Sequence, residues 1–414
     1  MSNLVITSNI KRLLENFTAL SILQISNYVL PLLTLPYLVR VLSPDKFGLI
    51  AFGQALIQYF ILFTDFGFNL SAVREISLNR ENKTKVSEIF CTVYIIKCIL
   101  ASISFMVLCL AVTFVPKLNN DWILYLLMFG TVVGNMLFPV WFFQGMECMR
   151  YVTIFNVLSK LIFTILIFAI IKQESDYILF PLINSFGYIV AGVSGLWMVF
   201  SKFSILLVLP PKDVIFEQLK LSYHFFLSRV CLALYTVSNT FLLGFMTNNE
   251  ITGFYAAAEK LIRAVEGMNQ PIINTLYPYI SKTKNKRLYK ASVYIGISIG
   301  AISFLIFFVF SSAITQILYG AEFGTAANIL RMYAIDLMIV FPSGLIGLPI
   351  LAAFGHIKYL NVTNIIGFLT YLVLISGLLL LAELNVNFIV VAIIIAESVV
   401  LVSRIVGLKK YNLW

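Results

Sequence analysis

The sequence predicts an all-α integral membrane protein, with twelve transmembrane helices in two six-helix lobes around a central cavity. Of its 414 residues, 60% are hydrophobic and only 12% are charged, and the mean hydropathy is +0.95. Long apolar runs follow one another along the whole chain, and each approaches the roughly 20 residues that span a bilayer core of about 30 Å. We expect spans at 17–39, 47–68, 89–114, 122–143, 152–171, 178–200, 224–246, 254–279, 291–318, 331–354, 359–382 and 387–407.

The distribution of basic residues predicts the orientation of these spans. Most of the 29 lysines and arginines fall in connections on one side, which the positive-inside rule assigns to the cytoplasm. Both termini are therefore expected in the cytoplasm. The cluster Lys282, Lys284, Lys286 and Arg287 is a topology signal that also suits anionic lipid headgroups. The bias explains most of the +10 net charge, so a nucleic-acid partner is not expected.

Residues suited to catalysis or metal binding are scarce. The five cysteines lie in spans or at their cytoplasmic ends, so no disulfide framework is implied. The two histidines, His224 and His356, stand alone. The connections are short, and none on the outer face could hold a catalytic module. We therefore expect no enzyme activity, no metal site and no cofactor.

The chain divides into two halves of similar design. We expect an N-terminal lobe over 1–200, a cytoplasmic connector over 201–223 that contains Pro210 and Pro211, and a C-terminal lobe over 224–414. Residues 41–49 and 245–254 both read as a span end, a polar turn, a glycine and an apolar run. An even number of spans per half makes any repeat parallel, an architecture that suits alternating access to a cavity between the lobes.

Charged residues within the spans indicate where function lies, because a charge at the bilayer centre costs about 2.5–3.5 kcal/mol on insertion scales. The eighth span carries Glu259, Arg263 and Glu266 on one stripe, bordered by Lys260. One interpretation is a self-neutralised ladder that holds helices together. The favoured interpretation is the wall of a polar cavity.

Five basic residues lie inside the predicted spans: Lys97, Lys160, Arg229, Lys260 and Arg263. Together they predict a cationic chamber suited to a phosphate or pyrophosphate group. For the lysines, extension of the side chain toward the headgroups is the alternative.

Acidic residues in the spans are candidates for coupling to an ion gradient, because a buried carboxylate can carry a proton. The candidates are Glu397, Glu259, Glu266 and Asp65. Pairing between helices is the alternative role for Glu397.

Several segments resemble a known family. Residues 66–77 (Phe-Gly-Phe-Asn-Leu-Ser-Ala-Val-Arg-Glu-Ile-Ser), Val140 to Glu147 followed by Met149 and Tyr151, and Tyr255 to Arg263 followed by Leu276-Tyr277-Pro278 are similar to segments of bacterial O-antigen flippases. These belong to the multidrug/oligosaccharidyl-lipid/polysaccharide exporter superfamily. The resemblance covers most of the chain.

The resemblance implies a function in polysaccharide and lipopolysaccharide biosynthesis. It implies translocation of an undecaprenyl-pyrophosphate-linked oligosaccharide between the leaflets of the bacterial inner membrane, with or without ion coupling. Membrane lipids, a polysaccharide polymerase and chain-length machinery would be its partners.

Other functions are less consistent with the sequence. An organic-cation exporter of the same superfamily is the main alternative, but it would need acidic residues where basic ones stand. A membrane glycosyltransferase, polymerase or ligase would need a larger outer loop. A lipid II flippase usually has two additional spans.

Overall fold

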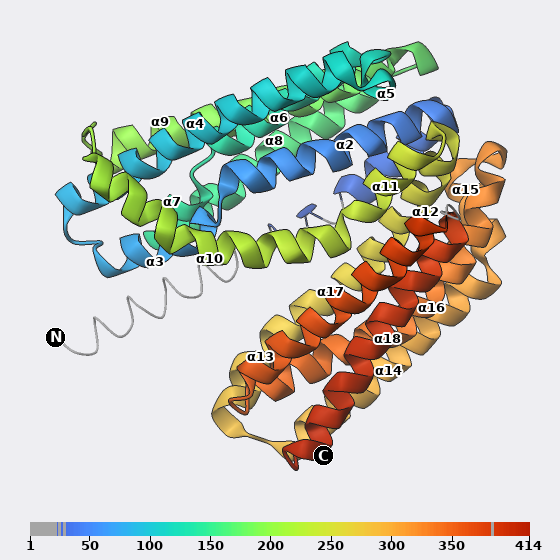
Figure 1. The fold of residues 1–414 in the computed structure, drawn as a ribbon. Helices are drawn as coiled ribbons and strands as arrows, with labels where there is room; N and C mark the ends of the chain where they lie inside the picture. The colour runs from blue at the N-terminus through green and yellow to red at the C-terminus, as the bar shows by residue number, and fades with distance from the viewer. Residues whose placement is uncertain (1–22, 24–25, 28–29, 382–384) are drawn as a thin grey trace. The chain divides into compact units, whose positions relative to one another are not determined.

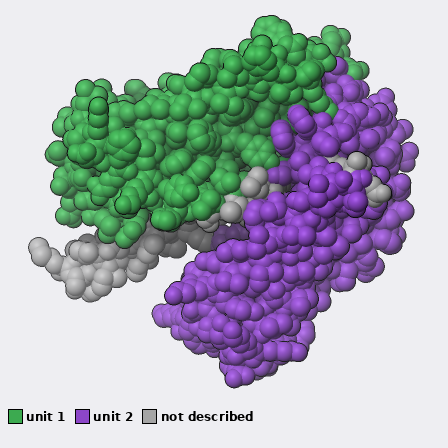
Figure 2. Space-filling view, viewed as in Figure 1, with its two compact units in different colours: residues 1–34, 52–237 green, residues 35–51, 238–414 purple. Residues whose placement is uncertain are grey.

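The computed structural model describes residues 23, 26–27, 30–381 and 385–414, and this part of the chain folds into helices joined by short connections (Figure 1). Contacts divide the chain into two compact units, which Figure 2 colours separately. Unit 1 comprises residues 1–34 and 52–237, and unit 2 comprises 35–51 and 238–414.

Unit 1 is built from helices α2 to α10, although α2 begins within unit 2. Their bounds are α2 (Pro44–Asp65), α3 (Phe68–Leu78), α4 (Lys83–Phe114), α5 (Pro116–Asn119), α6 (Trp122–Leu137), α7 (Val140–Gly145), α8 (Met149–Ile170), the 3-10 helix η1 (Glu174–Ile178), α9 (Leu179–Phe203) and α10 (Lys212–Thr236).

Unit 2 is built from the remaining helices. Their bounds are α11 (Ser238–Met246), α12 (Asn249–Gly267), α13 (Asn269–Thr283), α14 (Lys286–Val309), α15 (Ser311–Tyr319), the 3-10 helix η2 (Ala321–Phe323), α16 (Gly324–Ile346), the π-helix η3 (Gly347–Ala352), α17 (Ile357–Leu380) and α18 (Val386–Lys410). The helical segment Leu30–Val41 precedes α2.

Nine helical segments in the described part of the chain are long and apolar enough to cross a membrane. They match nine of the predicted spans, so the all-helical multi-pass class is confirmed. The nine are Pro44–Leu78, Lys83–Phe114, Trp122–Gly145, Met149–Ile170, Glu174–Phe203, Lys286–Val309, Ala321–Ala352, Ile357–Leu380 and Val386–Lys410.

The three other predicted spans differ from these nine. Most of 17–39 lies outside the described residues, which include only the apolar end Leu30–Val41. The spans at 224–246 and 254–279 are each divided, between α10 and α11 at Val237 and between α12 and α13 at Met268. The stripe of charges makes α12 more polar than the nine segments above.

The connector predicted over 201–223 contains two kinds of structure. Residues 204–211 have no regular secondary structure, and α10 begins directly after Pro211. The helix then continues to Thr236, so residues 212–223 are its first three turns. The assignment of functional lobes to 1–200 and 224–414 stays a prediction.

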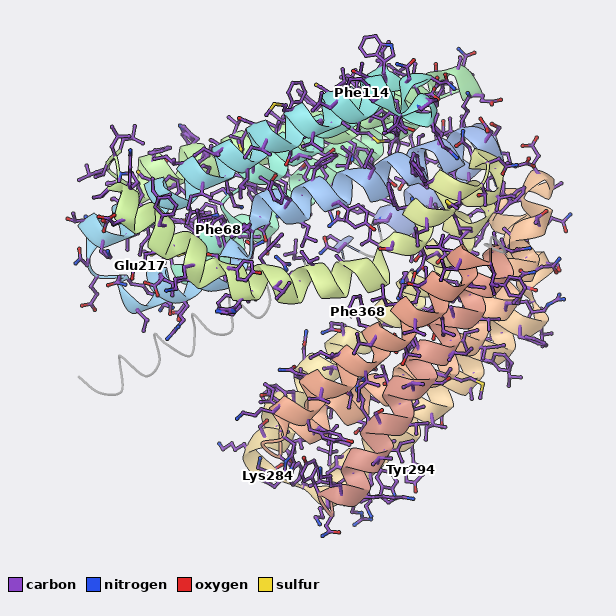
Figure 3. The ribbon with its side chains drawn as sticks, in the orientation of Figure 1. Phe68, Phe114, Glu217, Lys284, Tyr294 and Phe368 are labelled. Atoms are coloured by element: carbon purple, nitrogen blue, oxygen red, sulfur yellow. The ribbon has the colours of Figure 1, made fainter. Side chains whose placement is uncertain are left out.

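The outer surfaces of several helices are apolar. On α8, Ile154, Leu158, Leu161 and Ile165 recur at helical spacing and are 42–64% exposed. Phe114 at the end of α4, labelled in Figure 3, is 76% exposed. A soluble monomer rarely exposes contiguous apolar patches of this kind. These faces therefore suit contact with lipid acyl chains.

Close helix packing within each unit relies on small residues. In unit 1, α6 and α9 lie next to each other (Figure 1), and a side chain at Gly134 would collide with the backbone of Tyr188. In unit 2, a side chain at Gly300 would collide with the Leu337 carbonyl. Small residues allow this approach between apolar helices, where dispersion contacts replace the hydrophobic effect as the source of stability.

The two segments that resemble each other in sequence pack together inside unit 2. A methyl group added at Gly48 would lie 2.6 Å from the Gly253 nitrogen, and one added at Gly253 would lie 3.2 Å from the Gly48 nitrogen. Their two polar turns therefore meet through the glycine that each segment carries. Only glycine permits this backbone approach.

Candidate functional site

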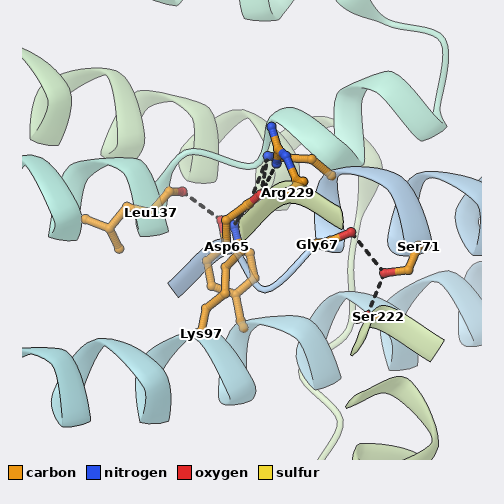
Figure 4. A network of polar contacts seen from close by, with 9 residues as sticks. Asp65, Gly67, Ser71, Lys97, Leu137, Ser222 and Arg229 are labelled. Atoms are coloured by element: carbon orange, nitrogen blue, oxygen red, sulfur yellow. Dashed lines mark hydrogen bonds and ion pairs between the residues drawn. The ribbon is translucent and has the colours of Figure 1, made fainter. Parts of the chain in front are cut away.

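The first charged cluster lies in unit 1 around Asp65, at the end of α2 (Figure 4). The Lys97 Nζ of α4 lies 3.2 Å from Asp65 Oδ1, and the Arg229 Nη1 of α10 lies 2.5 Å from Oδ2. The Asn69 amide donates to both carboxylate oxygens at 2.8 Å. We call Asp65, Asn69, Lys97 and Arg229 the Asp65 cluster.

The burial of the Asp65 cluster is uneven. The side chains of Lys97 and Asp65 are 2% and 5% exposed, whereas that of Arg229 is 42% exposed. One carboxylate neutralises only one of the two bases, so the cluster keeps a surplus positive charge. Its accessible donors belong to Arg229, whose planar guanidinium suits phosphate oxygens.

A tight backbone corner makes this cluster possible. After Asp65 the chain bends at Phe66 and Gly67, with φ values of 41° and 81°, before α3 begins. A methyl group on Gly67 would lie 2.8 Å from the Phe226 nitrogen and 2.9 Å from the Ser222 carbonyl oxygen. Glycine therefore satisfies both the positive φ and the close approach of α10.

Two further contacts hold α10 against this corner. The Ser71 and Ser222 hydroxyls are in hydrogen-bond contact (Figure 4), at 2.7 Å, and the rings of Phe66 and Phe226 stack with their centroids 4.5 Å apart. Arg229 follows Phe226 by one helical turn, so the stacking of Phe226 on Phe66 places the Arg229 guanidinium next to Asp65. The Phe-Gly segment at 66–67 is thus a positioning element.

Residues 140–147, the second segment that carries the family resemblance, include α7, which packs against α3. Trp141 and Phe142 are fully buried in the core of unit 1. Arg80 donates to the Gly145 carbonyl at 2.7 Å and pairs with Glu147 at 2.7 Å. This segment supports α3, and through it the Asp65 corner.

The second charged cluster lies in unit 2 along α12. Arg263 lies 3.7 Å from Glu259 and 2.9 Å from Glu266. The Thr240 hydroxyl donates to Glu259 at 2.8 Å, and Lys260 lies over the Phe47 ring, 5.0 Å from its centroid. We call Glu259, Arg263 and Glu266 the Arg263 ladder.

The surroundings of the Arg263 ladder are acidic. Asp336 on α16 is 1% exposed, and its electrostatic neighbours are Glu266, Glu397 and Arg263. Glu397 is half-buried on α18. The ladder and these two neighbours contain more acids than bases, which is the opposite balance from that of the Asp65 cluster.

The structure groups some predicted site residues and separates others. It joins Lys97 and Arg229 through Asp65, and it brings Glu259, Arg263 and Glu266 into one ladder with Lys260 beside it. Lys160 on α8 donates to Asn27 at 2.5 Å and is not part of either group. The roles predicted for these residues in binding or coupling stay predictions.

Two residues at these sites were not among the predicted site residues. Asn69 follows Asp65 by four residues. That spacing predicts contact within one continuous helix, but here α2 ends at Asp65 and α3 begins at Phe68. Asp336 lies in the span predicted at 331–354, and the neighbouring acids come from α12 and α18, so only the packing of three helices reveals the group.

These features define a multi-pass helical membrane protein with charged clusters inside its helical units, and solved structures of transporters share the fold. A multidrug resistance MATE family transporter of the MOP superfamily, in an inward-facing conformation, gives a TM-score of 0.71 over 96% of this chain and 98% of the other at 14% identity. The lipid II flippase MurJ, in an inward closed conformation, gives 0.73 over 97% and 87% at 15% identity.

Sequence comparison identifies the family to which the chain belongs. The family model described as "Polysaccharide biosynthesis protein" matches residues 13–284. The "Putative O-antigen transporter" of Escherichia coli (strain K12) is 31% identical over 83% of this chain and 84% of that protein. A protein of the same description from Shigella dysenteriae is 27% identical over 86% and 91%. The chain belongs to the polysaccharide biosynthesis protein family, which confirms the family that the sequence motifs indicated.

Proposed function

We propose that this protein is a flippase that moves an undecaprenyl-pyrophosphate-linked oligosaccharide, such as an O-antigen repeat unit, from the cytoplasmic to the periplasmic leaflet. Its family membership and the O-antigen transporters among its relatives support this proposal. The observation that carries it is the surplus positive charge of the Asp65 cluster, with a half-exposed Arg229 at its edge.

The proposed mechanism is alternating access in a membrane protein of twelve spans with two six-helix lobes. Arg229, Lys97, Lys160, Lys260 and Arg263 are the proposed ligands of the pyrophosphate and of acidic sugars. Charge-assisted hydrogen bonds to phosphate oxygens are about twice as strong as neutral ones. The polyprenyl tail would remain in the lipid while the headgroup crosses, and no covalent bond would be broken.

The proposed setting is the bacterial inner membrane, with both termini in the cytoplasm. There the flippase would deliver its product to a polysaccharide polymerase and the chain-length machinery. Glu397, Glu259, Glu266 and Asp65 are the candidates for coupling to an ion gradient. Of these, Asp65 contacts two bases, so its availability to an ion would depend on release of those bases.

The test uses proteoliposomes loaded with an undecaprenyl-pyrophosphate-linked oligosaccharide. We would measure how fast the sugar becomes accessible to an external glycosidase, with and without an imposed proton gradient. Protein-dependent exposure is expected. Its absence across several oligosaccharides, together with export of an organic cation such as ethidium, would contradict the flippase proposal and support the alternative exporter function.

Arg229→Gln tests the observation that carries the proposal. It removes the half-exposed guanidinium but leaves Lys97 on Asp65, and we expect at least a tenfold loss of flipping rate. The matched control is Arg287→Gln, which makes the same change at an exposed position in the first turn of α14. Equal rates for the two variants would remove Arg229 from the proposed binding site.

A further inference from the structure

A pocket of polar, uncharged side chains lies inside unit 1, apart from the Asp65 cluster. It is a cavity of about 190 Å³ among α2, α6 and α9. Its polar lining consists of Gln54, Gln58, Thr131, Asn184 and Tyr188, and no charged residue lines it. All of these residues belong to unit 1.

Helical spacing brings these groups together. Gln54 and Gln58 are one turn apart on α2, and Asn184 and Tyr188 are one turn apart on α9, so each pair lies on a single helix face. Hydrogen bonds between α6 and α9 hold the pocket wall in place. Ser185 Oγ donates to the Leu127 carbonyl at 2.6 Å and lies 3.2 Å from the Thr131 hydroxyl.

Two polar side chains in this pocket have hydrogen-bonding groups that the described part of the protein does not use. Among the described residues, neither the Gln58 amide nor the Tyr188 hydroxyl makes a hydrogen bond to the protein, and the Asn184 amide reaches Thr131 only at 3.5 Å. Gln58 is exposed although it lies within an apolar membrane-span candidate. A polar group at that depth is costly against lipid, so it is expected to face water or a ligand.

The chemistry of the lining selects a class of ligand. Amides and hydroxyls can both donate and accept, which matches the hydroxyl groups of a sugar. Met128 and Phe180 add apolar wall, which suits the C–H face of a pyranose ring. A phosphate would instead require cationic donors, and the pocket has none.

The size of the pocket limits how much ligand can enter. The cavity volume is about 190 Å³. It is smaller than the roughly 300–1,000 Å³ of pockets for drug-sized ligands. The pocket therefore suits one sugar ring and not a complete oligosaccharide.

We propose that this pocket binds one uncharged sugar residue of the transported headgroup and so contributes to selection of the glycan. This inference rests on the proposed function and extends it, since it separates recognition of a neutral sugar at α2, α6 and α9 from recognition of the pyrophosphate by basic side chains.

The test compares lipid binding with and without a sugar. Native mass spectrometry of the full-length protein would measure the affinity for undecaprenyl pyrophosphate and for the same lipid carrying N-acetylglucosamine, glucose, galactose or glucuronic acid. We expect the wild-type protein to prefer at least one neutral glycolipid over the bare lipid. Affinity for the glucuronic acid lipid should not depend on this pocket, because the pocket offers its carboxylate no cation.

Two variants remove the unused hydrogen-bonding groups. Gln58→Leu and Tyr188→Phe should each reduce affinity for the preferred glycolipid about three- to tenfold, as expected for one hydrogen bond, and leave affinity for the bare lipid unchanged. Retained binding of the bare lipid also shows that each variant is folded. The matched controls are Gln316→Leu and Tyr294→Phe, which make the same changes at exposed positions in unit 2.

The outcomes separate this inference from the flippase proposal. A wild-type protein without preference for any neutral glycolipid, or variants that keep the full preference, would overturn the pocket assignment. Flipping is measured separately in proteoliposomes. Loss of flipping in a protein that retains the neutral-sugar preference would count against the flippase function and not against the pocket.

Discussion

The Asp65 cluster and the Arg263 ladder are opposite solutions to the burial of charge. In the first, one carboxylate lies between two bases that come from α4 and α10. In the second, one guanidinium lies between two carboxylates of its own helix. The first depends on tertiary packing and keeps a positive surplus, whereas the second forms locally and lies among further acids. On this charge balance, we propose anion binding at the first and ion coupling at the second.

Asp65→Asn should have the largest effect on stability. It leaves Lys97 buried without its counter-charge, and removal of one partner from a buried ion pair typically costs about 3–5 kcal/mol. Thermal unfolding of the purified protein would measure the loss. The matched control is Asp45→Asn, which removes an exposed partner 3.8 Å from Lys46 and should cost at most about 1 kcal/mol. Equal melting temperatures would contradict the structural importance of the Asp65 cluster.

A double substitution sharpens this prediction. Asp65→Leu combined with Lys97→Met replaces the buried ion pair by apolar groups, a change that is often neutral or stabilising in proteins. It should recover most of the stability lost in Asp65→Asn, and flipping should be impaired because the proposed ligand Lys97 is removed. Recovery of both stability and flipping would limit the Asp65 cluster to a structural role.

Arg263→Ala should have the next largest effect. It leaves Glu259 and Glu266, with side chains 13% and 11% exposed, without the base between them. Because Arg263 is itself 35% exposed, we expect a smaller loss of stability, of about 1–2 kcal/mol, than at Asp65. Flipping should be abolished while insertion into the membrane is retained. A well-expressed variant with full flipping would exclude Arg263 from the site.

Gly67→Ala should perturb the Asp65 cluster indirectly. The substitution strains a residue with φ of 81° and pushes against α10, so we expect a loss of about 1–2 kcal/mol and a reduced flipping rate. Gly355→Ala is the control, because Gly355 has φ of 95° but no neighbouring atom within 4 Å of an added methyl group. Similar losses of flipping in both variants would assign the effect to backbone strain and not to the approach of α10.

Lys160→Met should have the smallest effect. Its amine contacts the neutral Asn27 and not an acid, so the substitution leaves no unpaired carboxylate. Stability should change by less than about 1 kcal/mol, and apparent affinity for the pyrophosphate lipid should fall a few-fold at most. A loss as large as that of Arg229→Gln would show that Lys160 belongs to the same functional group as the Asp65 cluster.

The sequence by itself determined the class of the protein and the ladder on α12. Hydropathy identifies spans because a helix must satisfy its own backbone in lipid, and residues three and four apart meet on any helix. For the same reason Glu259, Arg263 and Glu266 could be placed on one stripe before their distances were known. Hydropathy did not give the break at Met268 that divides the predicted span 254–279 into α12 and α13.

Only the tertiary structure decided which charges meet across helices. Lys97 and Arg229 lie far from Asp65 along the chain, and their contact depends on the corner at Gly67 and on the approach of α10. The neutral pocket likewise requires α2, α6 and α9 to pack at close range. Helical periodicity gives the face on which a side chain lies, but it carries no information about the helix that this face contacts. That pairing is set by packing, through small residues such as Gly67 and Gly134 that let particular helices come close.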